Sequence, residues 1–305
     1  YAESSMMYYR TDLFEQAGIE MPEQPTWTQV RDWAEQLHGS EEGLAGICLR
    51  GKPGWGENMA FVSTLVNTFG GRWFDEQWNP ELNSEAWNNA ISFYVDLLSN
   101  YGPPGASSNG FNENLALFSR GNCAMWVDAT SAAGKLYDES ESDVAGTLGF
   151  APAPIAETPK GSHWLWSWAL AIPASSEHKE AAQAFITWAT SEEYIELVGE
   201  TNGWTSVPPG TRESTYANEQ YTSAAPFAGF VLNAIKEADP TDSSLEPNPY
   251  VGVQFVGIPE FQSIGTQVGQ TIAAALTGDT SVEQALDSAQ RATERTMQRA
   301  GYIER

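Results

Sequence analysis

The sequence predicts an α/β fold. Short apolar runs typical of strands alternate along the chain with segments whose apolar residues recur at helical spacing. Hydrophobic residues make up 41% of the 305 residues and charged residues 18%, which favours a packed core over disorder. A chain of this length corresponds to about two ordinary domains. No run of about 18 apolar residues occurs, so no membrane-spanning helix is predicted.

The first third of the chain begins with a predicted strand over 5–9. A short helix follows it and ends near Gly18. Thr26 and Gln29 form a capping box, and apolar residues at helical spacing then predict a helix that extends to Leu37. Further apolar runs predict helices over 59–69, 84–98 and 112–119 and strands over 45–49, 123–127 and 144–154.

In the second half, the segment 164–172 predicts a strand on which three tryptophans share one face, because side chains alternate along a strand. Ser176 is predicted to cap a helix that ends at Trp188, and Ser191 a helix that ends at Gly203. The region 205–260 is rich in loops. The remaining predicted helices cover 225–238, 262–276 and, after a capping box at Ser281 and Gln284, the segment up to Ala300.

The charge balance excludes one class of partner. The chain has 40 Asp and Glu against 15 Lys and Arg, a formal net charge of -25, so nucleic acid would be repelled. With 3 His and 2 Cys, a zinc site or a Cys/His nucleophile is not expected. His38, His163 and His178 show no metal-binding or catalytic spacing. The sequence therefore predicts neither a metal nor a cofactor.

The aromatic content is higher than a core of this size needs, with 12 Trp, 11 Tyr and 13 Phe. Several of the tryptophans stand in short polar stretches, such as Trp55 between Gly54 and Gly56. An indole offers a flat apolar face and one N–H donor. Beside carboxylates and Arg, it suits a ligand rich in both C–H and hydroxyl groups, such as a sugar or polyol. The alternative for each tryptophan is ordinary packing in the core.

Three local segments carry a resemblance to a known family. The order of the predicted elements, with the segments 3–14, 169–185 and 278–286, resembles the extracellular solute-binding proteins of ATP-driven sugar importers, the maltose-binding-protein-like group. Within that group, further segments are similar to the sorbitol/mannitol (polyol)-binding branch. These are 49–58, 67–75, 125–130, 164–168, 207–212 and 254–261.

The resemblance implies a periplasmic-binding-protein-like type II fold of two lobes. In the family a signal peptide and about half of the N-terminal lobe precede the position that Tyr1 occupies here, so we expect this chain to lack both. Such a truncated chain would expose apolar surface and associate, whereas the full-length protein is expected to be a monomer. The implied lobes are 5–165 with 245–305 (C-terminal) and 1–4 with 166–244 (remnant of the N-terminal), with crossovers near 1–8, 164–172 and 238–256.

The resemblance also places a ligand cleft between the lobes. Glu3 falls at a cleft-facing carboxylate of the family, where it can accept two hydroxyls; the alternative is a solvated terminal residue. Arg50 falls at a polar ligand contact, with an ion pair to Glu57 or Asp128 as the alternative. Trp55 falls at an aromatic that stacks on the ligand. Asp128 ends a strand at the cleft, where ligand hydroxyls or Arg50 would be its partners.

Seven other residues complete the predicted set. Of the three tryptophans on the 164–172 strand, Trp166 and Trp168 are expected to line the cleft and Trp164 to lie in the core. Weaker expectations of ligand contact come from the flanks of the proline-rich loop and of the last crossover. These are Trp204, Arg212, Tyr250, Gln254 and Phe255.

Cys48 and Cys123 lie in two predicted strands of the same lobe. The oxidising compartment that the family occupies allows a disulfide if their Cα atoms come within about 7 Å. The equal alternative is two buried free thiols.

The function implied is non-catalytic. The protein would capture a sugar alcohol such as sorbitol or mannitol in the periplasm and deliver it to the membrane permease of an ABC transporter, by closure of the lobes around the ligand. A cleft lined by Trp and carboxylates also fits a glycoside hydrolase or a carbohydrate-binding module, although no pair of catalytic carboxylates stands out.

Overall fold

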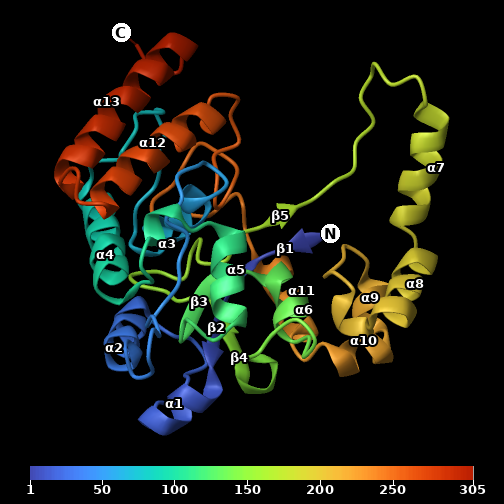
Figure 1. Ribbon diagram of the computed structural model, residues 1–305. Helices are drawn as coiled ribbons and strands as arrows, with labels where there is room; N and C mark the ends of the chain where they lie inside the picture. Colours follow the sequence, from blue (N-terminus) through green and yellow to red (C-terminus); the bar gives the residue numbers. More distant parts are fainter. Residues whose placement is uncertain (305) are drawn as a thin grey trace.

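A computed structural model describes residues 1–304 (Figure 1). Helices predominate, and the strands are few and short. The strands are β1 (Ala2–Glu3), β2 (Ser5–Arg10), β3 (Met125–Ala129), β4 (Leu148–Pro152) and β5 (Trp166–Ser167). The α-helices are α1 (Thr11–Ala17), α2 (Trp27–Leu37), α3 (Asn58–Thr68), α4 (Glu85–Tyr101), α5 (Phe111–Ser119), α6 (Ala133–Leu136), α7 (Lys179–Ala189), α8 (Glu192–Asn202), α9 (Glu213–Ala217), α10 (Glu219–Ala224), α11 (Ala228–Glu237), α12 (Phe261–Leu276) and α13 (Val282–Ala300).

A three-stranded antiparallel sheet lies at the centre of the molecule, in the order β3-β2-β4. Met6, Met7 and Tyr8 of the middle strand are completely buried, because both faces of β2 are covered. A second, two-stranded ladder joins β1 to β5, with Glu3 opposite Trp166. Ser4 alone separates β1 from β2 in the chain, so one continuous segment contributes to both sheets.

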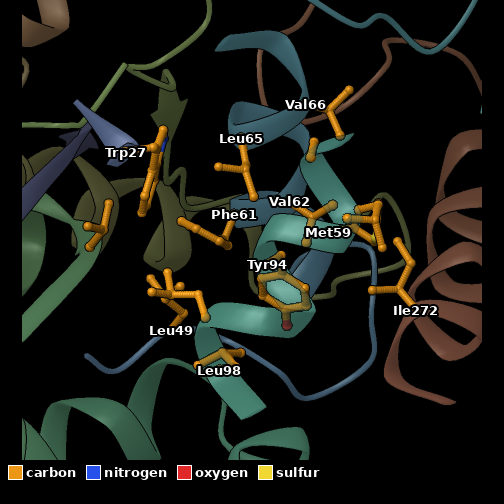
Figure 2. Close-up of a cluster of buried hydrophobic side chains, with 14 of the residues drawn as sticks. Trp27, Leu49, Met59, Phe61, Val62, Leu65, Val66, Tyr94, Leu98 and Ile272 are labelled. Carbon is orange, nitrogen blue, oxygen red and sulfur yellow. The ribbon is translucent and has the colours of Figure 1, made fainter. Parts of the chain in front are cut away.

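The main hydrophobic core lies between one face of the sheet and the helices α2, α3, α4 and α12. Figure 2 shows part of it, where Trp27, Phe61 and Tyr94 pack together with aliphatic residues of α3 and with Ile272 of α12. All eleven residues of α3 are buried, as the long apolar run predicted. A second core cluster covers the other face of the sheet and includes Met6, Tyr8 and Trp126.

Several sequence predictions are confirmed. The capping box at Thr26 begins α2 and that at Ser281 begins α13, while Ser191 caps α8. Gly18 and Gly301 end their helices in the left-handed conformation that glycine adopts readily. Cys48 and Cys123 form a disulfide with Cα atoms 5.9 Å apart, which decides between the two alternatives.

Three predictions of local structure are wrong. The segment 45–49 lies beside β3 but makes only two isolated parallel bridges, Ala45 with Cys123 and Cys48 with Trp126, which do not form a continuous ladder. The predicted strand over 164–172 is reduced to Trp166–Ser167, since β1 offers only two residues to pair with. Ser176 does not cap α7; His178 precedes that helix, and the Ser176 hydroxyl accepts from the His178 backbone N–H.

The arm, which we define as residues 168–202, extends from β5 through a long connection to α7 and α8 (Figure 1). No residue of α7 is buried, and large apolar side chains such as Phe185 and Trp188 are exposed by 57% and 46%. By contrast, Val207, Tyr221 and Val231 lie in the core cluster on the central sheet. Within the range 166–244, which the resemblance assigns to one lobe, α7 is thus exposed whereas the segment from Val207 onward packs on the central sheet. The lobe boundaries themselves stay a prediction.

Over the described residues, the structure contains no helix that is both long and apolar enough to cross a membrane.

Candidate functional site

A cavity of about 500 Å³ lies where the two sheets meet, open to solvent on one side. Its walls come from β1, β5 and the loop before α3, with contributions from the start of α5 and the end of β3. The lining residues are Tyr1, Glu3, Arg50, Trp55, Gly56, Glu57, Ala60, Phe111, Asn112, Ala129, Ser131, Trp164, Trp166, Trp168 and Gln254.

Arg50 and Asp128 form a buried ion pair at the floor of this cavity. Arg50 Nε and Nη2 donate to the two carboxylate oxygens of Asp128 at 2.8 and 2.6 Å. Asp128 is completely buried and also accepts the Ala129 backbone N–H at 2.6 Å. A bidentate geometry of this kind offsets much of the cost of burying both charges. Arg50 therefore forms the ion pair that was expected as the alternative, with Asp128 rather than Glu57 as its partner, and its contact with a ligand stays a prediction.

Arg50 nevertheless faces the cavity. Its guanidinium carbon lies 5.3 Å from the ring centre of Phe111 and 5.5 Å from that of Trp164, so two aromatic faces enclose it. Nη1 donates to the Gly56 carbonyl at 2.9 Å. Three of the five N–H groups of a guanidinium are thus used by the protein, which leaves two for a ligand.

Glu3 supplies a second carboxylate, and its residue is only 7% exposed. The Ser131 hydroxyl donates to Glu3 Oε2 at 2.7 Å. Burial raises the pKa of Glu3 above its usual range, and the charge of Asp128 adds to this effect. The hydrogen bond from Ser131 and the charge of Arg50 oppose it. A ligand hydroxyl that donates to Glu3 would replace part of the lost hydration.

Three polar atoms of lining residues are buried without a hydrogen-bond partner. They are Glu57 Oε2 and the indole Nε1 atoms of Trp164 and Trp166. Buried polar atoms in native structures are nearly always paired, but these three are also inaccessible to water, so a ligand could reach them only if neighbouring side chains moved. The set contains one acceptor and two donors, and a hydroxyl group can serve both kinds.

Aromatic rings form one wall of the cavity. The ring of Trp166 lies 5.9 Å from that of Trp55 and 5.9 Å from that of Trp168, tilted by 60° and 76°. Tyr1 continues the wall beside Trp168 at 6.3 Å. Phe255 packs edge-on against Trp166 at 5.7 Å and supports the ring.

The structure brings together only part of the predicted site. Six of the eleven residues line the cavity, namely Glu3, Arg50, Trp55, Trp166, Trp168 and Gln254. The side-chain amide of Gln254 bonds to both backbone groups of Leu165, so Gln254 also fixes the approach to β5. Asp128 and Phe255 lie directly behind the lining, against Arg50 and Trp166.

The other three predicted residues lie outside the cavity lining. Tyr250 is buried in the main core, where its hydroxyl accepts the Trp73 backbone N–H at 3.1 Å; burial raises the pKa of Tyr250 to about 12. Trp204 packs over Gly199 of α8. Arg212 donates to the Thr190 carbonyl near the arm. The loop 205–212 contacts β1 through a hydrogen bond from the Ala2 backbone N–H to the Pro209 carbonyl at 3.3 Å, but none of its residues lines the cavity.

Sequence reasoning also missed lining residues. Trp164 was expected to lie only in the core; it is 2% exposed but contacts Arg50 from the cavity wall. The position of Ser131 three residues after Asp128, in the turn that follows β3, was an unused signal. The other missed residues are Tyr1, Gly56, Glu57, Ala60, Phe111, Asn112 and Ala129. Within residues 1–304, no group of three or more His, Cys, Asp or Glu is arranged to hold a metal ion.

Solved structures confirm the predicted fold. A solute-binding protein of an ABC transporter from Agrobacterium vitis S4, with bound D-mannitol, is 56% identical and superposes with a TM-score of 0.98 over 100% of this chain and 73% of that chain. A solute-binding protein from Agrobacterium radiobacter K84 in complex with ribitol is 25% identical, with a TM-score of 0.80 over 97% and 70%. The α/β, periplasmic-binding-protein-like fold that the resemblance implied is therefore correct.

Sequence comparisons agree with these structures. A mannitol-binding protein from Pseudomonas aeruginosa is 60% identical over 302 residues, which make up 99% of this chain and 69% of that protein. Residues 1–196 match the family of bacterial extracellular solute-binding proteins. The chain thus belongs to the bacterial extracellular solute-binding protein family.

Proposed function

We propose that this protein captures an acyclic sugar alcohol, mannitol first among the hexitols, and delivers it to the permease of an ABC importer. The observation that carries the proposal is the 60% identity to a mannitol-binding protein over almost the whole chain. The 56% identical structure with bound D-mannitol supports it independently. The cavity supports it as well, because it combines carboxylate, guanidinium and indole groups in a single pocket.

Each group has a role that suits a polyol. Glu3 accepts from ligand hydroxyls, while the free N–H groups of Arg50 donate to them. Trp55 and Trp166 cover the C–H face of the carbon chain. An acyclic polyol has no flat ring face, so matching of hydroxyls dominates its recognition. Trp168 and Gln254 complete the proposed contacts, and Asp128 acts by holding Arg50 in place.

Closure of two lobes around the ligand is the proposed mechanism. The lobes are those the resemblance implies, with the crossovers at the segments that carry β1 and β5. Ligand that bridges the lobes stabilises the closed state through contacts absent from the open state. The proposed location is the periplasm, and the proposed functional form of the full-length protein is a monomer that engages the permease.

We infer that no reaction is catalysed. Both oxygens of Asp128 are engaged by Arg50, so this carboxylate is not arranged as a free nucleophile or base. The relatives carry names of solute-binding proteins. Nothing in the site favours the alternatives of a glycoside hydrolase or a carbohydrate-binding module.

Isothermal titration of the full-length protein with hexitols, pentitols and cyclic hexoses tests this function. Mannitol or another hexitol is expected to bind most tightly and to leave the titrant chemically unchanged after prolonged incubation. A parallel thermal-shift series should give the same order, because binding raises apparent stability by mass action. Tighter binding of glucose or maltose than of every hexitol would disprove the polyol assignment. Release of product from an aryl glycoside would disprove the non-catalytic one.

A further inference from the structure

Two glycines lie on one face of α12, at positions 265 and 269. Both are buried, and residues four apart on a helix are neighbours on the same side. Glycine in a helix interior destabilises the helix relative to alanine, so a buried pair calls for a reason in the packing. The reason is the close approach of the loop 54–56, which carries Trp55 to the ligand cavity.

The contact leaves no room for a methyl group at either glycine. A Cβ atom on Gly265 would lie 2.8 Å from Trp55 Cβ and 3.3 Å from Trp55 Cα. A Cβ atom on Gly269 would lie 2.5 Å from Asn58 Oδ1 and 3.0 Å from the Gly54 backbone nitrogen. The obstructing atoms at Gly265 belong to the backbone of Trp55 and to its first side-chain carbon. They cannot swing aside as the end of a flexible side chain would.

Hydrogen bonds attach the same loop to the helix. Asn58, which is completely buried, donates from Nδ2 to the Gly269 carbonyl at 2.9 Å and accepts the Gly54 backbone N–H at Oδ1, at 3.1 Å. On its other side, the loop accepts a hydrogen bond from Arg50 at the Gly56 carbonyl. The backbone of α12 therefore fixes a loop that holds two cavity residues.

We propose that Gly265, assisted by Gly269, is a positioning residue that sets the place of the Trp55 ring and with it the room that the cavity leaves for a ligand. Trp55 lines the cavity on one side and a groove along α12 on the other, so its ring stands between the helix and the ligand. The opposing ring is Trp166, 5.9 Å away. This inference rests on the proposed function only where it speaks of ligand; the placement of Trp55 is independent of it.

Gly265→Ala tests the proposal, with Gly229→Ala as the matched control. Gly229 is an exposed glycine in α11 whose added Cβ would meet no atom within 4 Å. In Gly265→Ala, the added methyl displaces Trp55, and the dissociation constant for mannitol should rise by about tenfold or more, as overpacking of a fitted contact predicts. Ribitol, which is one carbon shorter, should lose less. The control should stay within about twofold for both ligands.

Two further measurements separate positioning from a general loss of structure. In a Trp55→Ala background, Gly265→Ala should have a smaller effect on mannitol affinity than in the wild type, because the loop is still displaced at Cα and Cβ of position 55 but no indole ring is left to move. A crystal structure of Gly265→Ala without ligand should show the Trp55 ring moved relative to Trp166. An unmoved ring, or an equal loss for mannitol and ribitol in both backgrounds, would overturn the proposal. If the wild-type protein binds no polyol while the ring moves, the proposed function fails and the positioning role stands.

Discussion

The arm, residues 168–202, and the body of the molecule, which we define as the described residues outside the arm, differ in the burial of their tryptophans. Trp73, Trp87 and Trp126 in the body are essentially unexposed and lie within aromatic clusters. Trp168 and Trp188 in the arm are about half exposed, at 55% and 46%. Helix α7 of the arm is as amphipathic as helices of the body but contains no buried residue, whereas Ile195 and Val198 of α8 pack against the core cluster that includes Tyr8 and Trp126. Helix formation and helix burial are thus separate properties of this chain, and only the second stabilises a fold strongly.

The largest expected effect concerns the disulfide, which exists only in the body. It closes a loop of 75 residues, for which chain entropy predicts a contribution of about 4.5 kcal/mol. Cys48→Ala combined with Cys123→Ala should lower the free energy of unfolding by an amount of that order, measured by urea denaturation. Alkylation and intact mass of the untreated protein provide the control. If both cysteines of the untreated protein react with the alkylating agent, the disulfide is absent and does not contribute to the difference in stability between the body and the arm.

A matched pair of tryptophan substitutions measures the contrast directly. Trp73→Ala removes a side chain that is 1% exposed and donates from Nε1 to Ser63 Oγ, so it should cost about 3–5 kcal/mol of stability. Trp188→Ala, in the arm, should change the free energy of unfolding by less than about 0.5 kcal/mol. The same arm substitution should reduce self-association in sedimentation velocity, since it removes exposed apolar surface. Equal losses of stability would show that the arm is packed in solution.

The ion pair at the cavity floor allows a finer test of how the body supports the site. Asp128→Ala and Arg50→Ala should each weaken mannitol binding by about 1.5–3 kcal/mol, the range for hydrogen bonds to charged groups. The first acts through Arg50, which loses its anchor, and the second removes the donor itself. Calorimetry measures both, with Arg212→Ala as the control near the arm. If Arg212→Ala loses as much mannitol affinity as either of these variants, the binding site lies closer to the arm than the cavity does.

The smallest expected effect is a pH dependence at His163, which lines a small pocket in the body of the molecule. Burial lowers the pKa of His163, while its hydrogen bond with the Ser5 carbonyl at 2.9 Å and the charge of Glu237 oppose this shift. The other charged residues that line this pocket with His163 and Glu237 are Lys160, Asp239 and Asp242. As the pH falls, the unfolded state takes up the proton first, so this contribution is fully present above about pH 6.5 and is lost below it. Wild type should lose more stability than His163→Gln between about pH 7 and 5, with His178→Gln as the control. Parallel pH profiles for wild type and His163→Gln would exclude this role.

Local sequence signals predicted the helices better than the strands. Capping boxes at Thr26 and Ser281 depend on atoms three residues apart, so sequence alone contains the whole interaction. The segment 45–49 and the 164–172 strand failed because a strand needs a partner that only the tertiary structure supplies. The same limit applies to the site. Arg50 and Asp128 were predictable as strand-end charges, whereas the exclusion of Arg212 depends on the path of a loop.

Ser4 has a mechanical consequence beyond its place between β1 and β2. The residue is completely buried, and its backbone N–H donates to Thr130 Oγ1 at 3.0 Å, beside the end of β3. Because Ser4 is the single residue between β1 and β2, a rotation of one sheet against the other must be taken up in this segment by the dihedral angles of Ser4. A change in the dihedral angles at Ser4 would turn β1, together with β5 that pairs with it, relative to β2. Ser4 would thus act as a one-residue hinge between the two sheets, directly beside Glu3 of the ligand cavity.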